Sequence, residues 1–407
     1  MGLSTRPVID RIRFLDENAL ADGFCLLPQC PDRMTDSLAS TPLDAWHRAA
    51  GAKMVPFAGY EMPIQYSSIV AEHQACRTAA AVFDVSHMGR LKFEGDGSEN
   101  LLDHLLTRRV SDMPLGRVRY GLICDENGGV LDDVLVSNLE TPSQKRFHLL
   151  VVNASNRQKI IDWITPRMPD FPTVTMTDRT ELTAMIAVQG PKAMDVCKRL
   201  FKSDPAKLKY YQAVITDQMG KPVIVSRTGY TGEDGFELVV RAEEANRVWE
   251  NLMLIGRDEG FLAAGLGARD TLRMEAAMPL YGHELDETID PITAGLSFAC
   301  NSDGRSYIGR DAIAKIAADG PSRVRIGLLP EGKRPAREGL SVLTPDGQRI
   351  GTITSGGPSP TLGHPIAMAY VDAAHAKLDR YQIDIRGKMV NAVPTALPFY
   401  KRPTNKV

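Results

Sequence analysis

One turn between two apolar segments limits the possible folds of this chain more than any other feature. Residues 118–124 and 130–138 have the composition of strands, and Asp125-Glu-Asn-Gly-Gly129 between them is typical of a β-hairpin. Further strands and amphipathic helices surround this hairpin, at residues 91–94, 100–108, 147–153 and 154–165. Strands that return through hairpins, with helices on one side, predict an antiparallel α+β unit.

A second unit of the same plan is expected between residues 182 and 259, with a helix at 191–201, although no sequence repeat connects the two units. A further helix is expected at 265–275. After residue 321 the chain is rich in short strands separated by Gly and Pro, which predicts a small antiparallel β domain. The predicted fold class is therefore α+β, with two antiparallel α+β units and a C-terminal β-rich domain.

Ahead of both units, the chain has the signals of two helices. We expect the first at 43–50, with Thr41 as its cap and Pro42 in its first position, and the second at 68–80. The segment 53–66 between them has two prolines, several aromatic and apolar residues and no steady period. We interpret it as an irregular segment that lines a pocket.

Composition restricts the classes of function. The chain has 407 residues, a net charge of -2, 43% apolar and 24% charged residues, as expected for a soluble globular protein of two or three domains. The absence of basic blocks argues against nucleic acid as the main ligand, and no apolar run approaches the ~20 residues of a membrane span. Six cysteines without a CxxC pair indicate a reducing compartment, and eight histidines without an HExxH pattern predict no metal site.

Residues 1–40 differ from the rest of the chain. They contain no apolar core of a signal peptide, their acidic residues argue against a mitochondrial presequence, and Arg6 stands where myristoylation requires Ser or Thr. We therefore expect a cytoplasmic protein. Either Met34 is its biological start, or residues 1–33 form a loosely held extension.

The segment Arg227-Thr-Gly-Tyr-Thr-Gly-Glu-Asp-Gly-Phe-Glu237 carries a signal for a ligand. Its glycines recur at every third residue, which permits turns that other residues avoid. No Lys-Ser/Thr pair and no helix follow it, so it does not have the pattern of a phosphate-binding loop. A carboxylate beside the ring of Tyr230 suits a flat heterocycle with N–H donors, whereas the alternative is a hairpin loop with solvated carboxylates.

Two adjacent acids, Asp132 and Asp133, lie inside an apolar strand. Neighbouring strand residues face opposite sides, so one carboxylate must point away from the other. A buried carboxylate with a raised pKa could position or transfer a proton, whereas a strand-edge pair after a turn would need no function. These two interpretations are evenly balanced.

Three further side chains have chemistry that a site could use. Arg269, near the start of a helix, could hold a planar carboxylate, and a surface salt bridge is the alternative. Tyr120 could stack on a flat ligand or belong to the core. His87 could act as a general base, although a lone histidine is more often a structural donor.

Seven motifs, taken in order, resemble the aminomethyltransferase (T-protein) family of the glycine cleavage system, from about Thr41 to the C-terminus. They lie at residues 55–63, 83–89, 127–133, 227–237, 265–273, 280–286 and 398–402. The resemblance implies that the chain moves the aminomethyl carbon of glycine from the dihydrolipoyl arm of the lipoylated H-protein to tetrahydrofolate. The products are 5,10-methylene-tetrahydrofolate, ammonia and the reduced carrier.

The same resemblance implies a three-domain cloverleaf around a central folate site. After the extension at 1–40, the implied parts are a discontinuous folate-binding first domain at 41–88 and 177–285, a second domain at 89–176, and a C-terminal β-rich domain at 286–407.

Site residues follow from the matching positions. Asp133 matches the family's catalytic aspartate near the reacting folate nitrogens. Glu237 and, less directly, Tyr230 match residues that hold the pterin. Arg269 matches an arginine near the benzoyl-glutamate end of folate. Tetrahydrofolate enters as a co-substrate, and the chemistry requires no metal.

Two more tyrosines and two departures complete the comparison with the family pattern. Tyr120 matches a tyrosine that lines the folate site, and Tyr400 matches one through a looser alignment. Ser137 stands where some members have an aromatic residue, and Phe298 stands where a Trp is common. Both departures concern ring packing and leave the charged roles in place.

Two other functions remain as alternatives. A folate-dependent demethylase of a small methylated sulfonium or amine would keep the pterin site and change the donor pocket. A folate-binding accessory protein for iron–sulfur assembly would carry a cysteine where Ser306 stands. For the main interpretation, we expect the acidic carrier to dock on basic residues near the opening of the donor pocket.

Overall fold

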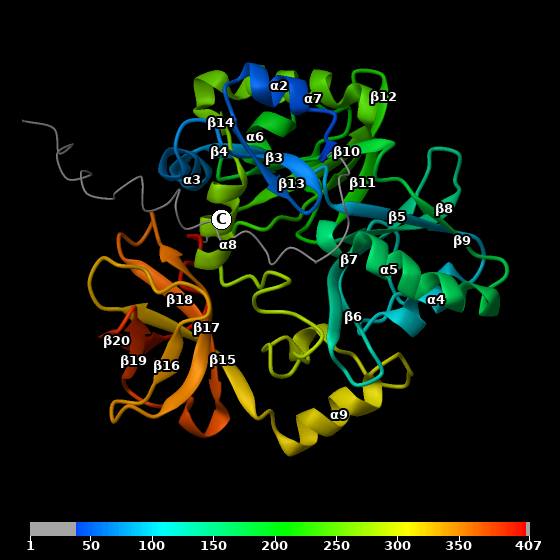
Figure 1. The fold of residues 1–407 in the computed structure, drawn as a ribbon. Coiled ribbons are helices and arrows are strands. Elements are labelled where there is room, and N and C mark those ends of the chain that lie inside the picture. Colours follow the sequence, from blue (N-terminus) through cyan, green and yellow to red (C-terminus); the bar gives the residue numbers. More distant parts are fainter. Residues whose placement is uncertain (1–37, 404–407) are drawn as a thin grey trace, which may run out of the picture.

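The computed structural model describes residues 38–403. Most of their strands form three groups, a six-stranded sheet, a five-stranded sheet and a barrel, around the helix α8 (Leu266–Glu275), and a small three-stranded sheet precedes these groups in the chain. Figure 1 shows the first sheet at the top, the second sheet on the right and a β-barrel at the lower left, with residues 276–322 crossing between them. Each group has its own apolar core. The expected fold class, two α+β units followed by a β-rich part, is confirmed.

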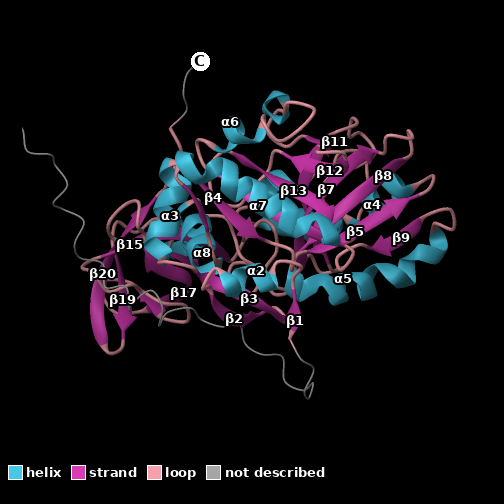
Figure 2. Ribbon diagram, turned by 90° about the horizontal axis from the view of Figure 1, so that it is seen from above, coloured by secondary structure: helices cyan, strands magenta, loops and turns pink. Residues whose placement is uncertain are grey.

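The first sheet combines one early strand with strands from much later in the chain. Its six strands have the order β11-β12-β13-β10-β4-β14, with β10 and β14 on the two edges of β4. All five residues of β4 are buried, and its apolar side chains pack against α7 on one face and against α3 and α8 on the other. Figure 2 shows α3 and α7 lying over these strands. The bounds are β4 (Ala80–Asp84), β10 (Thr183–Gln189), β11 (Ala213–Gln218), β12 (Lys221–Ser226), β13 (Gly235–Arg241), β14 (Phe261–Ala263), α3 (Ile69–Thr78), α6 (Ala193–Cys197) and α7 (Ala245–Gly256).

The second sheet contains the hairpin expected from the sequence. Its five strands have the order β6-β7-β8-β5-β9, and Leu122 of β6 lies opposite Asp133 of β7. The helices α4 and α5 pack their apolar sides onto this sheet and enclose its core. The bounds are β5 (Gly89–Glu94), β6 (Val118–Cys124), β7 (Val130–Glu140), β8 (Arg146–Val152), β9 (Thr175–Asp178), α4 (Ser98–Leu105) and α5 (Arg157–Ile164).

The C-terminal strands close into a six-stranded antiparallel barrel with the order β15-β18-β17-β16-β19-β20. Closure pairs both edges of every long strand, so this small domain exposes few free backbone groups. Its interior is filled by branched apolar side chains and the buried ring of Tyr381. The bounds are β15 (Arg323–Pro330), β16 (Ser341–Leu343), β17 (Arg349–Pro358), β18 (Pro365–Asp372), β19 (Tyr381–Ile385) and β20 (Lys388–Thr395).

The cap expected at the first helix is wrong. The helix α2 runs from Asp44 to Ala49, one residue inside the expected 43–50 at each end, and no side chain caps it. The Thr41 hydroxyl instead donates to Asp84 Oδ2 at 2.6 Å, because that buried carboxylate competes for it. Pro42 therefore precedes the helix.

The expected irregular segment at 53–66 is a β-hairpin. Strands β2 (Lys53–Phe57) and β3 (Tyr60–Gln65) pair in a three-stranded sheet with β1 (Ala39–Ser40). The sequence pattern concealed them because the register shifts beside Met54 and its partner Pro63, where a proline is tolerated in a strand. The expectation that the segment reaches a pocket holds for Phe57 and Ala58, which line the central cavity.

Two other helices differ from expectation. The helix expected at 191–201 is reduced to α6, and a helix that we did not expect, α9 (Arg310–Asp319), leads toward the barrel. Of the extension expected at 1–40, only residues 38–40 are described, and two of them pair with β3 as β1. The alternative start at Met34 lies outside the described residues. No helix within residues 38–403 is long and apolar enough to cross a membrane.

Candidate active site

A cavity of about 830 Å³ lies where the three groups of strands meet. Its wall combines side chains from the second sheet, the loop before β13, the helix α8 and the barrel. Residues that are far apart in the sequence therefore face one space: Tyr120, Asp133, Asn153, Tyr230, Glu237, Arg269, Arg273, Phe298, Arg325 and Arg337. Five of the six site residues expected from the sequence are among them.

Asp133 is held from two sides at the cavity wall. The Asn153 side-chain amide donates to its Oδ1 at 2.7 Å, and the Tyr120 hydroxyl donates to its Oδ2 at 3.2 Å. Burial raises the pKa of Asp133, and these two hydrogen bonds oppose the rise. The carboxylate is thus fixed in place with a proton affinity above that of an ordinary aspartate.

Asp132 has a different environment, as the strand alternation requires. It is fully buried and accepts hydrogen bonds from the side chains of Asn153 and Asn156, at 2.8 and 2.6 Å, and from the Asn153 backbone N–H at 3.0 Å. Burial and the nearby charge of Asp133 raise its pKa. Asp132 does not line the cavity, so only Asp133 can meet a ligand there.

Asn153 is a residue that sequence analysis missed. It follows the last residue of β8, where the chain leaves the sheet beside β7, and its amide contacts both aspartates. A polar amide directly after an apolar strand was the available signal. Its importance depends on which strand lies next to β8, and that is not visible in the local sequence.

Glu237 of β13 is the carboxylate that the loop 227–237 presents to the cavity. It is 6% exposed, and its Oε2 accepts a hydrogen bond from the Thr228 hydroxyl at 2.5 Å. Burial raises the pKa of Glu237, while Thr228 and the charge of Arg269 lower it. Its remaining acceptor capacity faces a mainly apolar space, where an N–H donor of a ligand would be bound strongly.

The other two acids of this loop have structural partners. Glu233 accepts from Arg77 Nη1 at 3.0 Å, and Asp234 accepts from both Arg227 Nε and Nη2, at 3.1 and 2.5 Å. Neither acid lines the cavity. The alternative of solvated carboxylates is therefore wrong for this loop, because its acids are paired with arginines or face the cavity.

Only one of the three loop glycines has the special backbone angle expected of them. Gly232 has a φ of +81°. At Gly229 a Cβ would lie 1.8 Å from Gln189 Oε1, and at Gly235 it would lie 2.2 Å from the Val188 carbonyl oxygen. These two glycines serve close packing of the loop onto β10.

Arg269 projects from the first turn of α8 into the cavity. Its guanidinium lies 4.7 Å from the centre of the Tyr230 ring, and no carboxylate among residues 38–403 forms an ion pair with it. The Tyr230 hydroxyl donates to the Pro279 carbonyl, which fixes the ring. The surface salt bridge considered for Arg269 is therefore wrong, and its charge is available to an anionic ligand.

Tyr400 lies outside the cavity, unlike the other expected site residues. Its hydroxyl donates to Glu233 Oε1 at 2.7 Å, and its ring lies against the guanidinium of Arg77. A folate contact for Tyr400 does not follow from this geometry. Ser137 is buried and also lies outside the cavity, whereas Phe298 lines it and stacks on Tyr120 with ring centres 6.2 Å apart.

His87 lines the cavity and is 2% exposed. Its Nδ1 has no hydrogen-bonding partner among the described residues, so it is not the structural donor we considered more common. Burial, and then the charge of Arg269, lower its pKa. The imidazole is consequently neutral at physiological pH and a weak base.

The barrel adds positive charge to its side of the cavity. The lining residues include Arg325, Arg334, Arg337 and Arg386, and Arg273 of α8 lies on the same side. Sequence analysis did not single out these arginines, because their common direction depends on how the barrel packs against α8. Within the described part of the chain, no three His, Cys, Asp or Glu side chains form a group that could hold a metal ion.

Two family models cover most of the described chain. The GCVT N-terminal domain matches residues 43–304, and the glycine cleavage T-protein C-terminal barrel domain matches residues 323–401. The boundary between them falls just before the barrel strand β15. The two matches thus agree with the two sheets and the barrel seen in the structure.

Individual relatives support the same family assignment. Aminomethyltransferases of Streptomyces avermitilis and Streptomyces coelicolor are 45% and 44% identical to this chain, over 89% and 90% of its length and 97% and 98% of theirs. The crystal structure of glycine cleavage system aminomethyltransferase T from Bartonella henselae matches with a TM-score of 0.83 at 32% identity, over 90% of this chain and 99% of that one. These matches favour the main interpretation over the demethylase and the iron–sulfur accessory protein. This chain therefore belongs to the aminomethyltransferase (T-protein) family of the glycine cleavage system.

Proposed function

We propose that this aminomethyltransferase binds tetrahydrofolate in the central cavity and that Asp133 handles the proton at the reacting folate nitrogen. The observation that carries the proposal is the convergence of Asp133, Glu237 and Arg269 on one space from three different elements. One is a carboxylate with a raised pKa, one is a buried acceptor, and one is a cation that forms no ion pair with a carboxylate among residues 38–403.

The pterin ring fits the side of the cavity near Glu237. A pterin offers adjacent N–H donors, and a buried carboxylate is their natural acceptor. Tyr230, held by its hydroxyl, provides a ring face beside Glu237, and the Tyr120–Phe298 pair provides another aromatic surface at the wall. In this orientation the reacting nitrogens point toward Asp133.

The glutamate end of the folate extends past Arg269 toward the barrel. Its carboxylates need cations, and Arg269 together with the four barrel arginines supplies them. A ligand with one neutral, donor-rich end and one anionic end is therefore complementary to this cavity in charge.

The proposed chemistry exchanges bonds at a single carbon. Two folate nitrogens form bonds to the methylene carbon, while its bonds to the amine and to the dihydrolipoyl sulfur break. The protons lost by the folate nitrogens end on the released ammonia and on the sulfur. A carboxylate whose pKa is raised toward neutrality can accept and return such a proton, and the remaining rate gain comes from holding the reactants together.

The second partner in this proposal is the lipoylated H-protein. Its dihydrolipoyl arm must bring the aminomethyl carbon to Asp133, so the carrier docks where the cavity opens. Acidic carriers would favour a basic rim, and the arginines of the barrel side satisfy that requirement.

The test is formation of 5,10-methylene-tetrahydrofolate from aminomethylated H-protein and tetrahydrofolate. Wild type should form product, and Asp133→Asn should lose roughly 10²–10⁴-fold in kcat while keeping its affinity for tetrahydrofolate. Asp112→Asn, which changes an exposed aspartate paired with Arg119, is the matched control and should keep full activity. A wild-type protein that binds tetrahydrofolate and yields no product would refute the proposal.

A further inference from the structure

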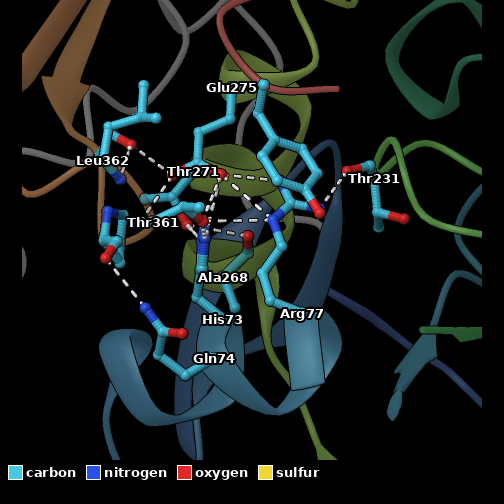
Figure 3. A network of polar contacts seen from close by, with 12 residues as sticks. His73, Gln74, Arg77, Thr231, Ala268, Thr271, Glu275, Thr361 and Leu362 are labelled. Carbon is cyan, nitrogen blue, oxygen red and sulfur yellow. Dashed lines mark hydrogen bonds and ion pairs between the residues drawn. The ribbon is translucent and has the colours of Figure 1, made fainter. Parts of the chain in front are cut away.

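Arg77 of α3 is buried behind the cavity walls, with a side chain that is 4% exposed. Its guanidinium contacts three segments that are far apart in the sequence (Figure 3). These are the loop before β13, the last turn of α8, and the connection between β17 and β18. Arg77 does not line the cavity, and neither do the residues it contacts.

The first contact is with the loop 227–237. Arg77 Nη1 donates to the Thr231 carbonyl at 2.8 Å and to Glu233 Oε1 at 3.0 Å. Tyr400 covers the guanidinium, with 4.0 Å between its ring centre and the guanidinium carbon. The residue directly before Thr231 is Tyr230, which faces the cavity. Arg77 therefore holds the loop from the side opposite to the ligand.

The second contact is with α8. Arg77 Nη2 donates to Glu275 Oε2 at 2.7 Å, and Nε donates to the same oxygen at 3.2 Å. Glu275 is fully buried at the last position of the helix. Six residues earlier, one helix face carries Arg269 into the cavity, and Arg273 follows on the same side. The helix α8 thus carries both the buried partner of Arg77 and two arginines of the cavity wall.

The third contact is with Thr361, in the connection between the barrel strands β17 and β18. The Thr361 backbone N–H donates to Glu275 Oε1 at 3.0 Å, and the Thr361 hydroxyl lies 2.8 Å from His73 Nε2. The Gln74 side chain donates to the Pro360 carbonyl at 2.9 Å. The strand β17, which ends at this connection, contributes Ser355 to the cavity wall. We call Arg77, Glu233, Glu275, Thr361 and Tyr400 the clasp.

We propose that Arg77 is a positioning residue for the tetrahydrofolate site. The clasp sets the distances in the cavity wall between the loop 227–237, the arginines Arg269 and Arg273 of α8, and the barrel. The inference rests on the proposed function, because the ligand that senses these distances is tetrahydrofolate. Removing the guanidinium leaves Glu233 and Glu275 buried without their shared cation. The two segments then separate, and the groups on their cavity side no longer fit one ligand.

The test compares tetrahydrofolate affinity, KM for both substrates and thermal stability in three variants. Arg77→Met should raise the Kd and KM for tetrahydrofolate roughly 2- to 30-fold, and KM for aminomethylated H-protein should stay unchanged. Arg77→Lys keeps the charge and should restore part of the affinity. Glu233→Gln keeps an acceptor for Tyr400 and should weaken tetrahydrofolate binding without unfolding the chain.

Arg305 offers a matched control. Its side chain is 6% exposed, it donates to the carbonyls of Leu106 and Thr107 at 2.7 and 3.0 Å, and it lies away from the cavity. Arg305→Met should reduce stability and leave tetrahydrofolate affinity unchanged.

The outcomes separate this inference from the proposed function. The positioning role is wrong if wild type binds tetrahydrofolate and forms product while Arg77→Met keeps wild-type affinity. If Arg77→Met does not fold, the same criterion applies to Glu233→Gln. Equal losses of affinity in the Arg77 and Arg305 variants would also overturn it, because they would reflect general destabilisation. If wild type itself binds no tetrahydrofolate, the proposed function is the part that fails.

Discussion

Replacement of Asn153 by leucine should shift the pH dependence of catalysis in a defined direction. The Asn153 amide donates to Asp133 Oδ1 at 2.7 Å and lowers the pKa of that carboxyl against the effect of burial. Leucine has a similar size and no donor. The pKa of Asp133 should therefore rise, and more of the enzyme should hold Asp133 in its protonated form at any pH near the pKa.

The size of the shift follows from the hydrogen bond. A bond to a charged group contributes about 1.5–3 kcal/mol, and 1.36 kcal/mol corresponds to one pKa unit. Asp132 loses a bond to the same amide and becomes protonated more readily, which removes some negative charge beside Asp133 and offsets part of the rise. We expect the acid limb of the kcat–pH profile to move upward by about one pH unit.

The measurement is kcat at saturating tetrahydrofolate and aminomethylated H-protein, from about pH 5 to pH 9. Asn156→Leu is the matched control, because Asn156 donates to Asp132 at 2.6 Å and to no oxygen of Asp133. Its acid limb should stay in place or move downward. The reasoning fails if Asn153→Leu leaves the acid limb unchanged, or if both variants move it upward equally.

Three further predictions concern binding, pH stability and packing. Glu237→Gln should weaken tetrahydrofolate binding by roughly 10- to 100-fold, because the site loses a charged acceptor, and KM for the carrier should stay unchanged. Titration calorimetry measures the Kd for tetrahydrofolate, and an unaltered Kd would contradict the prediction. Burial raises the pKa of Glu275, but the hydrogen bond from His73 and the charge of Arg77 outweigh burial and lower the pKa from 4.5 to about 2. The stabilising contribution of the Glu275 carboxylate is present above about pH 4.5 and is lost as the pH falls toward 2. In urea unfolding, the difference in stability between wild type and Glu275→Gln should therefore shrink from pH 6 to pH 3. A difference that stays constant over this range would contradict the prediction. Gly229→Ala should destabilise the fold by about 1–3 kcal/mol, because its Cβ would collide with Gln189. Gly121→Ala is the control and should destabilise the fold less, because a Cβ there meets no atom closer than 3.5 Å. Equal unfolding midpoints for the two variants would argue against a packing role for Gly229.

The elements with strong local signals were predicted correctly from the sequence. The hairpin of β6 and β7 has a turn sequence that specifies its geometry, and most of the connections between barrel strands contain glycine or proline. The errors occurred where a distant partner decides the outcome. Thr41 gives its hydroxyl to Asp84, a residue forty-three positions away, and so does not cap the helix that follows it.

The candidate site also contains residues that a local motif identifies and residues whose role depends on a distant partner. Motifs identified Asp133, Glu237 and Arg269, and the structure brings all three to one cavity. The sequence does not show that Glu233, in the same loop, is neutralised by Arg77, which lies 156 positions earlier. It also could not place Asn153 beside Asp133, because that contact requires β7 and β8 to be neighbours.

The position of β4 has a consequence for synthesis of this chain on the ribosome. This strand is made early, yet its hydrogen-bonding partners are β10 and β14, the latter ending at Ala263. At about 5–20 residues per second, β4 must wait roughly 5–20 seconds for β10 and about 10–35 seconds for β14 before both of its edges are paired. The second sheet, encoded entirely within that interval, can fold first. During this time β4 is an apolar strand with unpaired edges, a state that favours aggregation.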